Sequence, residues 1–267
     1  MRDAWRLAVG TFTAFPVEPP GRVDRTVLGR AMLLAPVTCV PAAFLWSAFG
    51  ALSATGWAPA GVVAVLALVG TALLSRALHL DGLADLADGL TSGHDPARSL
   101  QVMRRGDTGP AGAAALVLVL LLDTACLAVL LGSAAGTTLA VVALVASRLA
   151  CAVCARDGIP PARPEGLGQG VAGTVGRSRL VGLVVSVGAG AAVVTTWLSR
   201  PGVAWWAAAL SGLAVVLTAA AAAVVVRRQA VRRLGGVTGD VFGAAIEVAL
   251  ATALVTATVA LTALHRP

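Results

Sequence analysis

The chain has 267 residues, of which 58% are hydrophobic and only 12% are charged. Its mean hydropathy of +0.87 excludes an ordinary soluble domain and predicts a protein embedded in a membrane. The formal net charge of +7 is large enough for nucleic-acid binding, so the positions of the charges must decide what it means.

Apolar runs long enough to cross the hydrocarbon core, which takes a helix of about 20 residues, recur along the whole chain. We predict seven spans, at residues 31–53, 59–78, 111–131, 137–155, 180–198, 203–226 and 241–264. No polar segment between these runs is long enough to fold alone. The sequence therefore predicts an all-α, polytopic integral membrane protein with about seven transmembrane helices, in which residues 1–267 form a single transmembrane domain.

The segment before the first span has a pattern of its own. Residues 3–15, DAWRLAVGTFTAF, can form a short helix at the membrane surface that ends before Pro16. The next residues, PVEPPGR, are rich in proline and predict a non-helical connector. A surface helix and a connector are thus expected to lead into the first span.

The arginines are distributed unevenly between the two sides of the membrane. With the N-terminus on the inner side, 16 of the 20 basic residues precede the first span or lie in the inner segments 79–110, 156–179 and 227–240. The outer side receives only Arg200 and Arg266. Five tryptophans are predicted near the outer ends of the spans, where the ring suits the interface: Trp46, Trp57, Trp197, Trp205 and Trp206. This asymmetry follows the positive-inside rule, so the net charge reflects topology and predicts no nucleic-acid partner.

An acidic stretch, RALHLDGLADLADGL, at residues 76–90, leads from the end of the second predicted span into the first inner segment. On a helix, Asp81, Asp85 and Asp88 occupy positions i, i+4 and i+7 and form one stripe. Three neighbouring carboxylates repel one another, and hard oxygen ligands suit Mg²⁺, which takes further ligands from substrate phosphates. Gly82 and Gly89 are expected to leave space for a ligand beside the backbone. The spacing favours a metal and phosphate site, although the solvated face of a loop helix has the same spacing.

Arginines and glycines in the other inner segments are candidates for anion binding. Arg104 and Arg105 lie in RSLQVMRRGDTGPAG, residues 98–112. The segment RRQAVRRLGGVTGD, residues 227–240, contains Gly235 and Gly236, whose N–H groups can cradle an anion together with Thr238. Positive-inside topology predicts arginine runs as well, so both interpretations of the arginines stay open.

Several ionisable residues are predicted inside or at the ends of the spans. Asp240 is expected to be the N-cap of the last span, and Glu247 lies on the same helical face about two turns further in. Arg148 can pair with Glu247, reach a phosphate, or form a structural pair between helices. Asp123 lies in mid-span and can pair with Arg148 or be held neutral. The four cysteines also fall in spans and are interpreted as small buried residues without a disulfide.

Four segments carry a resemblance to a known family. They are LHLDGLADLADGL (78–90), SLQVMRRGDTGPAGAAALVLVLLL (99–122), RPEGLGQG (163–170) and GGVTGDVFGAAIE (235–247). With FTAFPV near the N-terminus, they resemble in order and spacing the cobalamin synthases, also named adenosylcobinamide-GDP ribazoletransferases. The resemblance extends over most of the chain. Ala14 and Asp123 depart from the family pattern, which is expected to have a basic residue at the first position and a basic or polar residue at the second.

The resemblance implies a Mg²⁺-dependent transfer at the bacterial cytoplasmic membrane, with an active site that faces the cytoplasm. A ribose hydroxyl of α-ribazole, or of its 5′-phosphate, attacks the pyrophosphate of adenosylcobinamide-GDP. GMP and adenosylcobalamin, or its 5′-phosphate, are the products.

The resemblance also suggests roles for individual residues. The metal is assigned to Asp81, Asp85 and Asp88, while Asp240 and Glu247 complete the metal shell or accept the proton of the attacking hydroxyl. His79 orients a substrate or transfers a proton. Phosphate oxygens are assigned to Arg76, Arg104 and Arg105, with Gly235, Gly236 and Thr238.

Two other classes of protein agree with parts of the sequence. A CDP-alcohol-type phosphotransferase also uses an acidic helical motif, but the arginine and the downstream carboxylates expected after DGLAD are missing. A secondary transporter would explain buried charges, but it is expected to have repeated halves and interrupted helices, and no repeat is visible. The sequence leaves the oligomeric state open, including a homo-oligomer.

Overall fold

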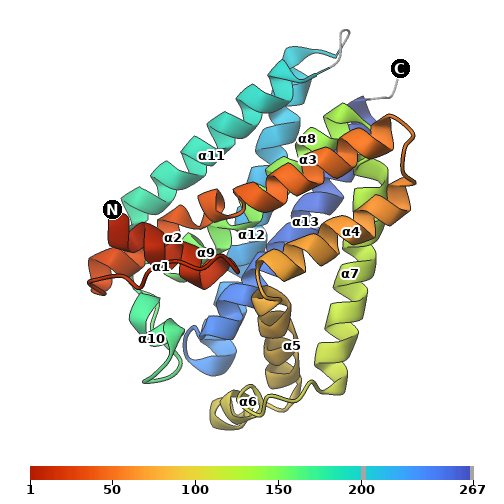
Figure 1. The fold of residues 1–267 in the computed structure, drawn as a ribbon. Helices are drawn as coiled ribbons and strands as arrows, with labels where there is room; N and C mark the ends of the chain where they lie inside the picture. The colour runs from red at the N-terminus through yellow and green to blue at the C-terminus, as the bar shows by residue number, and fades with distance from the viewer. Residues whose placement is uncertain (200–202, 265–267) are drawn as a thin grey trace.

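The computed structural model describes residues 1–199 and 203–264. Within these ranges the chain is predominantly helical and has no β-strand beyond two isolated bridges. Arg200 and Arg266, predicted on the outer side, lie outside the described residues. The helices in Figure 1 are α1 (Arg2–Phe12), α2 (Arg25–Thr38), α3 (Val40–Ala54), α4 (Ala60–Leu74), α5 (Leu78–Thr91), α6 (Pro96–Val102), α7 (Pro110–Leu130), α8 (Ala134–Ser147), α9 (Leu149–Cys154), α10 (Leu167–Val171), α11 (Arg177–Trp197), α12 (Trp205–Leu234) and α13 (Gly239–Leu264).

Long apolar helices confirm the predicted class, an all-α polytopic membrane protein. In the described residues, 6 helical segments are long and apolar enough to span a membrane: α2 with α3, α7, α8 with α9, α11, α12 and α13. A seventh span results if α4 and α5 are counted together, although they are bent by 90°. Helix α12 continues through the arginines to Leu234, where an inner loop was predicted. Arginine is a good helix former, and Arg232 and Arg233 in the last turn complement the helix dipole.

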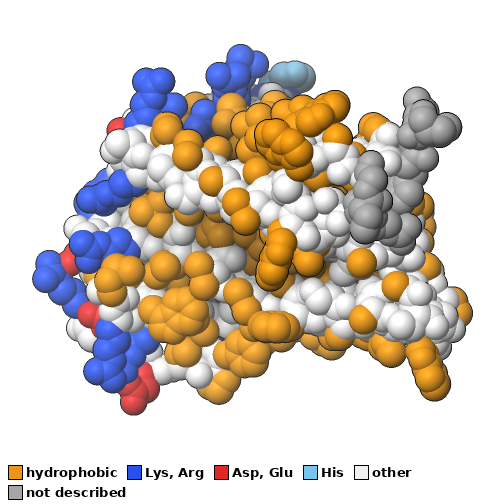
Figure 2. All heavy atoms as spheres, turned by 90° about the horizontal axis from the view of Figure 1, so that it is seen from above, with side chains coloured by type: hydrophobic (Ala, Val, Ile, Leu, Met, Phe, Trp, Pro, Cys, Tyr) orange, Lys and Arg blue, Asp and Glu red, His pale blue; other side chains and the backbone are white. Residues whose placement is uncertain are grey.

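The surface is divided between a charged end and an apolar remainder. Figure 2 shows arginine and acidic side chains gathered at one end, with apolar side chains over the rest of the visible face. Large apolar residues on several spanning helices are exposed, including Leu73 (71%), Leu118 (67%) and Val193 (68%). Such a surface is stable against lipid tails and not against water.

Five tryptophans were predicted to lie at the outer membrane interface, where their side chains would be exposed. One of the five predictions is wrong, because Trp46 is fully buried between α3 and α4. Its Nε1–H donates to Thr71 Oγ1 at 2.9 Å, so the polar end of the ring finds its partner inside the bundle. The other four are exposed: Trp57, Trp197, Trp205 and Trp206.

Three helical segments are interrupted inside the bundle, which the sequence did not predict. Helix α2 passes to α3 at Cys39, beside the prolines of both helices. Between α4 and α5, Arg76 and Ala77 adopt left-handed conformations, with φ of 56° and 54°. Helix α8 passes to α9 at Arg148. Cys39, Leu74 and Arg148 line one small cavity of about 20 Å³, so the three interruptions meet at one place.

Helix α5 packs along the first turns of α13 through glycine contacts. A Cβ atom at Gly82 would lie 2.7 Å from the carbonyl oxygen of Asp240, and one at Gly243 would lie 3.1 Å from the backbone of α5. Small residues let helix backbones approach closely in membranes. The expectation that Gly82 and Gly89 leave room for a ligand is therefore wrong, because α13 fills the space beside Gly82 and Met103 fills the space beside Gly89.

This contact predicts the effect of enlarging Gly82. We expect Gly82→Ala to push α5 from α13 and to lower the free energy of unfolding by about 1–3 kcal/mol, the usual cost of overpacking. The measurement is the midpoint of thermal unfolding in detergent. Gly182→Ala on α11 is the matched control, because a Cβ atom there meets nothing within 4 Å. Equal midpoints for the two variants would contradict the prediction.

Candidate active site

A cavity of about 290 Å³ lies between α5, the beginning of α13, the segment before α10 and the end of α1. Figure 1 shows α5 and α10 on either side of the beginning of α13. The charged and hydroxyl-bearing residues that line the cavity are Thr11, His79, Asp81, Arg163, Glu165, Thr238 and Asp240. The chain thus brings together residues from segments 78–90, 163–170 and 235–247, which are distant in sequence.

The three aspartates of the acidic stripe lie on α5 as predicted, but their carboxylates have different surroundings. Asp81 is exposed and lines the cavity. Asp88 is only 9% exposed, and its two oxygens accept hydrogen bonds from the N–H groups of Gly109 at 2.7 Å and Gly112 at 2.9 Å. These N–H groups belong to the start of α7, where a helix needs external acceptors. Asp88 therefore has a structural role that its spacing did not reveal.

Asp85 lies between the other two acids and is half-buried. Three carboxylates repel its charge and one guanidinium attracts it; these groups belong to Asp240, Asp81, Asp88 and Arg163. Among the described residues, no group of 3 His, Cys, Asp or Glu side chains is arranged to hold a metal ion by itself. Mg²⁺ does not need such a cage, because it usually takes one or two carboxylates together with water and phosphate. Asp81 lines the cavity, and Asp85 follows one turn later on α5, outside the lining. The hard oxygens of these two acids suit that mode chemically, and a third carboxylate ligand stays a prediction.

Asp240 is held at the cavity by the turn that precedes α13. Thr238 Oγ1 donates to Asp240 Oδ2 at 3.1 Å and accepts from the N–H of Val241 at 3.4 Å. Asp240 itself lies in the first turn of α13. Thr238, and not Asp240 as predicted, is therefore the residue whose side chain caps the helix, and this leaves the Asp240 carboxylate directed toward the cavity.

Gly235 and Gly236 shape the same turn. Gly235 ends α12 with φ of 80°, and its N–H donates to the carbonyl of Val231. A Cβ atom at Gly236 would lie 2.4 Å from the carbonyl oxygen of Pro160. The N–H of Val237 donates to that same oxygen at 3.0 Å. These glycines fix the turn against a neighbouring loop and do not line the cavity; anion binding by their N–H groups stays a prediction.

His79 and Glu247 form a buried pair at the inner wall of the cavity. Their exposed fractions are 3% and 7%, and His79 Nδ1 lies 3.7 Å from Glu247 Oε1. Within the described residues, neither ring nitrogen of His79 has a hydrogen-bond partner. A separation of 3.7 Å is longer than a hydrogen bond, as is common for catalytic pairs without substrate. The arrangement is that of an imidazole backed by a carboxylate at the wall of the cavity.

Arg148 and Asp123 lie deeper in the bundle. Arg148 is 3% exposed, donates from Nη1 to Ser147 Oγ at 2.8 Å, and attracts the charge of Glu247. Asp123 is fully buried, and in the described part of the chain its carboxylate oxygens have no hydrogen-bond partner. No ion pair within 4.0 Å joins Arg148 to either acid among the described residues. The direct pairings considered from sequence are therefore not formed.

The three arginines predicted to bind phosphate lie outside the lining of the cavity. Arg76 donates from Nη2 to the carbonyl oxygen of Gly10 at 2.8 Å, at the end of α1. Arg104 forms an ion pair of 2.9 Å with Glu165, and both side chains are exposed. Arg105 is also exposed. Phosphate binding by these residues stays a prediction, with Arg104 placed near the rim because Glu165 lines the cavity.

Arg163 lines the cavity, although no role was predicted for it. Its side chain is 15% exposed, and Nη1 lies 3.7 Å from Asp240 Oδ2. Nη2 donates to the carbonyl oxygen of Leu100 at 3.1 Å. Burial lowers the pKa of the Arg163 guanidinium from its ordinary value, and the charge of Asp240 opposes this shift. Its position in RPEGLGQG was the one sequence signal that pointed to this residue.

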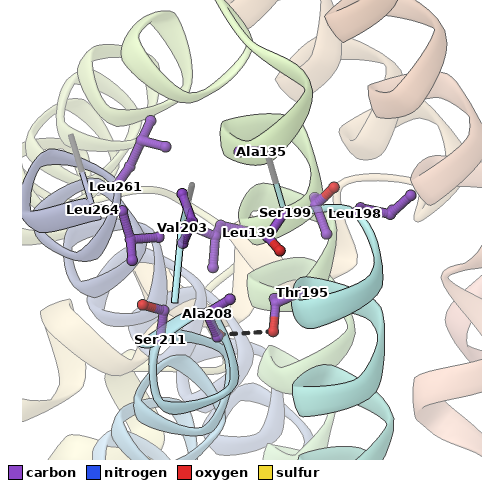
Figure 3. A pocket seen from close by; sticks show the side chains of 11 residues that line it. Ala135, Leu139, Thr195, Leu198, Ser199, Val203, Ala208, Ser211, Leu261 and Leu264 are labelled. Atoms are coloured by element: carbon purple, nitrogen blue, oxygen red, sulfur yellow. Dashed lines mark hydrogen bonds between the residues drawn. The ribbon is translucent and has the colours of Figure 1, made fainter. Parts of the chain in front are cut away.

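A second cavity lies at the opposite end of α13 and is mainly apolar. Its volume is about 30 Å³, and Figure 3 shows side chains of α8, α11, α12 and α13 around it. Thr195 Oγ1 donates to the carbonyl oxygen of Ala208 at 2.8 Å. No acidic or basic side chain of the described residues lines this cavity, so we assign it no chemistry.

Comparison with known proteins identifies relatives over nearly the whole length. A family model described as Cobalamin-5-phosphate synthase matches residues 4–258. An adenosylcobinamide-GDP ribazoletransferase from Nocardioides sp. is 45% identical over 248 residues, which are 93% of this chain and 95% of that protein. Proteins of the same name from Frankia casuarinae and Corynebacterium efficiens are 36% and 33% identical, over 91% and 96% of this chain and 90% and 91% of theirs.

No solved structure matches the chain significantly. The family model includes every segment that forms the cavity described above. The sequence resemblance is therefore confirmed, and the chain belongs to the cobalamin-5-phosphate synthase family.

Proposed function

We propose that this chain joins adenosylcobinamide-GDP to α-ribazole or α-ribazole 5′-phosphate, with release of GMP and adenosylcobalamin or its 5′-phosphate. This is the late step in which the nucleotide loop of the cobalamin is assembled. Membership of the family and the names of the relatives support the proposal. In the molecule itself, the proposal is supported by one cavity in which carboxylates, an imidazole and a guanidinium from distant segments of the chain lie together.

The proposed reaction is a substitution at phosphorus. A ribose hydroxyl oxygen forms a bond to the phosphorus that bears the cobinamide, and the bond from this phosphorus to the bridging oxygen of the pyrophosphate breaks. GMP leaves with the bonding electron pair, and the hydroxyl proton passes to a base. Such transfers depend on positioning and on charge neutralisation more than on covalent catalysis.

We propose Mg²⁺ as the cofactor, held by Asp81 and Asp85 together with substrate oxygens. When bound, the ion supplies positive charge that offsets the charge of the pyrophosphate and of the departing GMP. Support comes from the electrostatic repulsion among the acids of this cluster, which a cation would relieve. Asp240, oriented by Thr238, extends the same cluster across the cavity.

We assign the proton of the attacking hydroxyl to His79. The imidazole lines the cavity, and its two buried nitrogens have no hydrogen-bond partner within the described residues, so neither is committed to another protein group. Glu247 lies behind it and can stabilise the imidazolium that forms, which is the usual arrangement of a base and its orienting acid.

The proposal includes a location and an orientation. We place the chain in the bacterial cytoplasmic membrane, with the charged end of Figure 2 toward the cytoplasm. The cavity is built from the arginine-rich inner segments, and the positive-inside rule puts such segments on the cytoplasmic side. The lipid bilayer and the two soluble substrates are the partners in this proposal, which requires neither a nucleic acid nor a second copy of the chain.

The other two classes receive no support from the relatives, whose name describes a ribazoletransferase. The interrupted helices expected of a transporter are present at Cys39 and Arg148. Helix interruptions also serve enzymes, because they open backbone inside a bundle where it borders a cavity. The interrupted helices therefore do not favour a transporter over an enzyme that catalyses phosphotransfer.

The metal assignment predicts the behaviour of Asp81→Asn. We expect GMP release from adenosylcobinamide-GDP and α-ribazole phosphate to fall about 100-fold in the purified variant, because a charged metal ligand is lost at similar volume. Removal of Mg²⁺ by a chelator should abolish the wild-type reaction. Asp157→Asn is the control, since that side chain is 57% exposed and does not line the cavity. Wild-type turnover with unchanged Mg²⁺ dependence in Asp81→Asn would refute the metal site.

The surroundings of Asp88 predict a loss of stability instead. Asp88→Ala leaves the N–H groups of Gly109 and Gly112 without their acceptors, and we expect the free energy of unfolding to fall by about 1–3 kcal/mol. Thermal unfolding in detergent measures this, with Asp81→Ala as the comparison, because Asp81 faces the cavity. If the two variants unfolded at the same temperature, the capping role of Asp88 would be wrong.

The base assignment predicts a selective loss of turnover. We expect His79→Gln to lower kcat about 100-fold or more while KM for both substrates changes little, because general-base catalysis acts in the transition state. Steady-state kinetics of GMP release measures both constants. His94→Gln, at an exposed position outside the cavity, is the control. A rise in KM with unchanged kcat would instead indicate that His79 only binds substrate.

A further inference from the structure

Arg163 has hydrogen-bonding capacity that the described residues leave unused. It is the only arginine that lines the cavity among the described residues, and its side chain is 15% exposed. Its Nε is buried without a partner in that part of the chain, and Nη1 is 3.7 Å from Asp240, beyond hydrogen-bond length. Of the five N–H donors of a guanidinium, only one from Nη2 makes a hydrogen bond among the described residues, to the carbonyl oxygen of Leu100, while Nη1 forms the longer ion pair with Asp240. Buried donors without acceptors are destabilising, so the arrangement calls for an acceptor from outside the chain.

The backbone around Arg163 is fixed relative to the acids of the cavity. The N–H of Ala162 donates to the carbonyl of Val237 at 3.0 Å, and the N–H of Val237 donates to the carbonyl of Pro160 at 3.0 Å. A Cβ atom at Gly168 would lie 2.6 Å from the carbonyl oxygen of Val237. The arginine segment is thus held on both sides by the turn that carries Asp240. A guanidinium held in this way binds an anion with little loss of side-chain freedom.

The charges of the cavity indicate what kind of acceptor would bind. Asp81 and Asp240 repel a carboxylate or phosphate that lacks a cation of its own. The planar guanidinium of Arg163 can bind two phosphate oxygens at once, so it favours a phosphate as the acceptor. The three arginines predicted to bind phosphate do not line the cavity: Arg104 pairs with Glu165, Arg76 donates to the end of α1, and Arg105 is exposed.

We infer that Arg163 binds the pyrophosphate of the guanosine-diphosphate part of the donor, through its Nε–H and a terminal N–H, in place of the three arginines predicted from sequence. The inference rests on the proposed function for the identity of the donor. It goes beyond that proposal by naming the protein group that holds the donor while the phosphorus–oxygen bond to GMP breaks.

GDP is the probe that tests this assignment, because it contains the nucleotide and the pyrophosphate without the corrinoid. We would measure the Kd of GDP by calorimetry on the full chain in detergent, with Mg²⁺ present, for the wild type and for Arg163→Gln, Arg163→Lys and Arg156→Gln. We expect about 100-fold weaker binding for Arg163→Gln, from the loss of a two-fold charged contact. Arg163→Lys should recover part of the affinity, because lysine keeps the charge but not the planar fork.

Arg156→Gln is the matched control. It removes the same charge seven positions earlier in the chain, and Arg156 lies outside the lining and pairs with Asp157 at 3.8 Å. Its GDP affinity should equal that of the wild type. Equal losses in Arg156→Gln and Arg163→Gln, or a loss in Arg104→Gln or Arg105→Gln with wild-type affinity in Arg163→Gln, would overturn the assignment.

Two further measurements keep the test decisive. If Arg163→Gln unfolds at a much lower temperature because Leu100 loses its donor, Arg163→Lys decides: wild-type GDP affinity and wild-type KM for the donor in that variant would refute the assignment. Failure of the proposed function looks different. If GDP binding depends on Arg163 but the wild type releases no GMP from adenosylcobinamide-GDP, the proposed function is wrong. If both Arg163 variants turn over with an unchanged KM, only the role of Arg163 is wrong.

Discussion

The close contact between α5 and α13 is the constraint on which the site depends. Lipid tails are as apolar as leucine, so two helices in a membrane gain little from hiding apolar side chains and associate through tight packing of small residues. Gly82 and Gly243 provide that packing. The contact places Asp81 beside the beginning of α13 and His79 3.7 Å from Glu247. The acid that is proposed for the metal and the pair that is proposed for the proton are therefore positioned by the same two glycines.

The C-terminal ends of the helices create a second requirement, because the last carbonyl groups of a helix have no partners within it. Several arginines meet it: Arg76 donates to Gly10, Arg227 to Val153 and Arg233 to Leu90. Two roles were considered for the inner arginines from sequence, topology and phosphate binding, and satisfaction of carbonyl groups is a third. This role explains why arginine content is a poor guide to the phosphate site.

Local features of the fold were predictable from sequence, and contacts between segments were not. Hydropathy and helical spacing depend only on near neighbours in the chain, so six of the seven spans and the helix that carries Asp81, Asp85 and Asp88 were predicted correctly. The remaining predicted span, 59–78, corresponds to α4, which is a span only if it is counted together with α5. The bend at Arg76, the burial of Trp46 and the use of Asp88 at the start of α7 depend on residues from other helices. The segments that resemble the family indicated which parts of the chain form the candidate site. Residue spacing alone, however, does not distinguish an aspartate that faces a cavity from one that caps a helix.

Charge balance links the proposed metal to the guanidinium of the cavity. Asp81, Glu165 and Asp240 contribute three negative charges to the lining, against one permanent positive charge, from Arg163. A pyrophosphate that entered alone would add to this excess, and the repulsion would be strong in a partly buried site. A divalent cation held by the carboxylates would offset a large part of this excess, and the guanidinium would bind phosphate oxygens that such an ion leaves free. Neither charge is sufficient by itself, so we expect the affinity for the nucleotide to depend on both, with the arginine also setting the orientation of the phosphorus to be attacked.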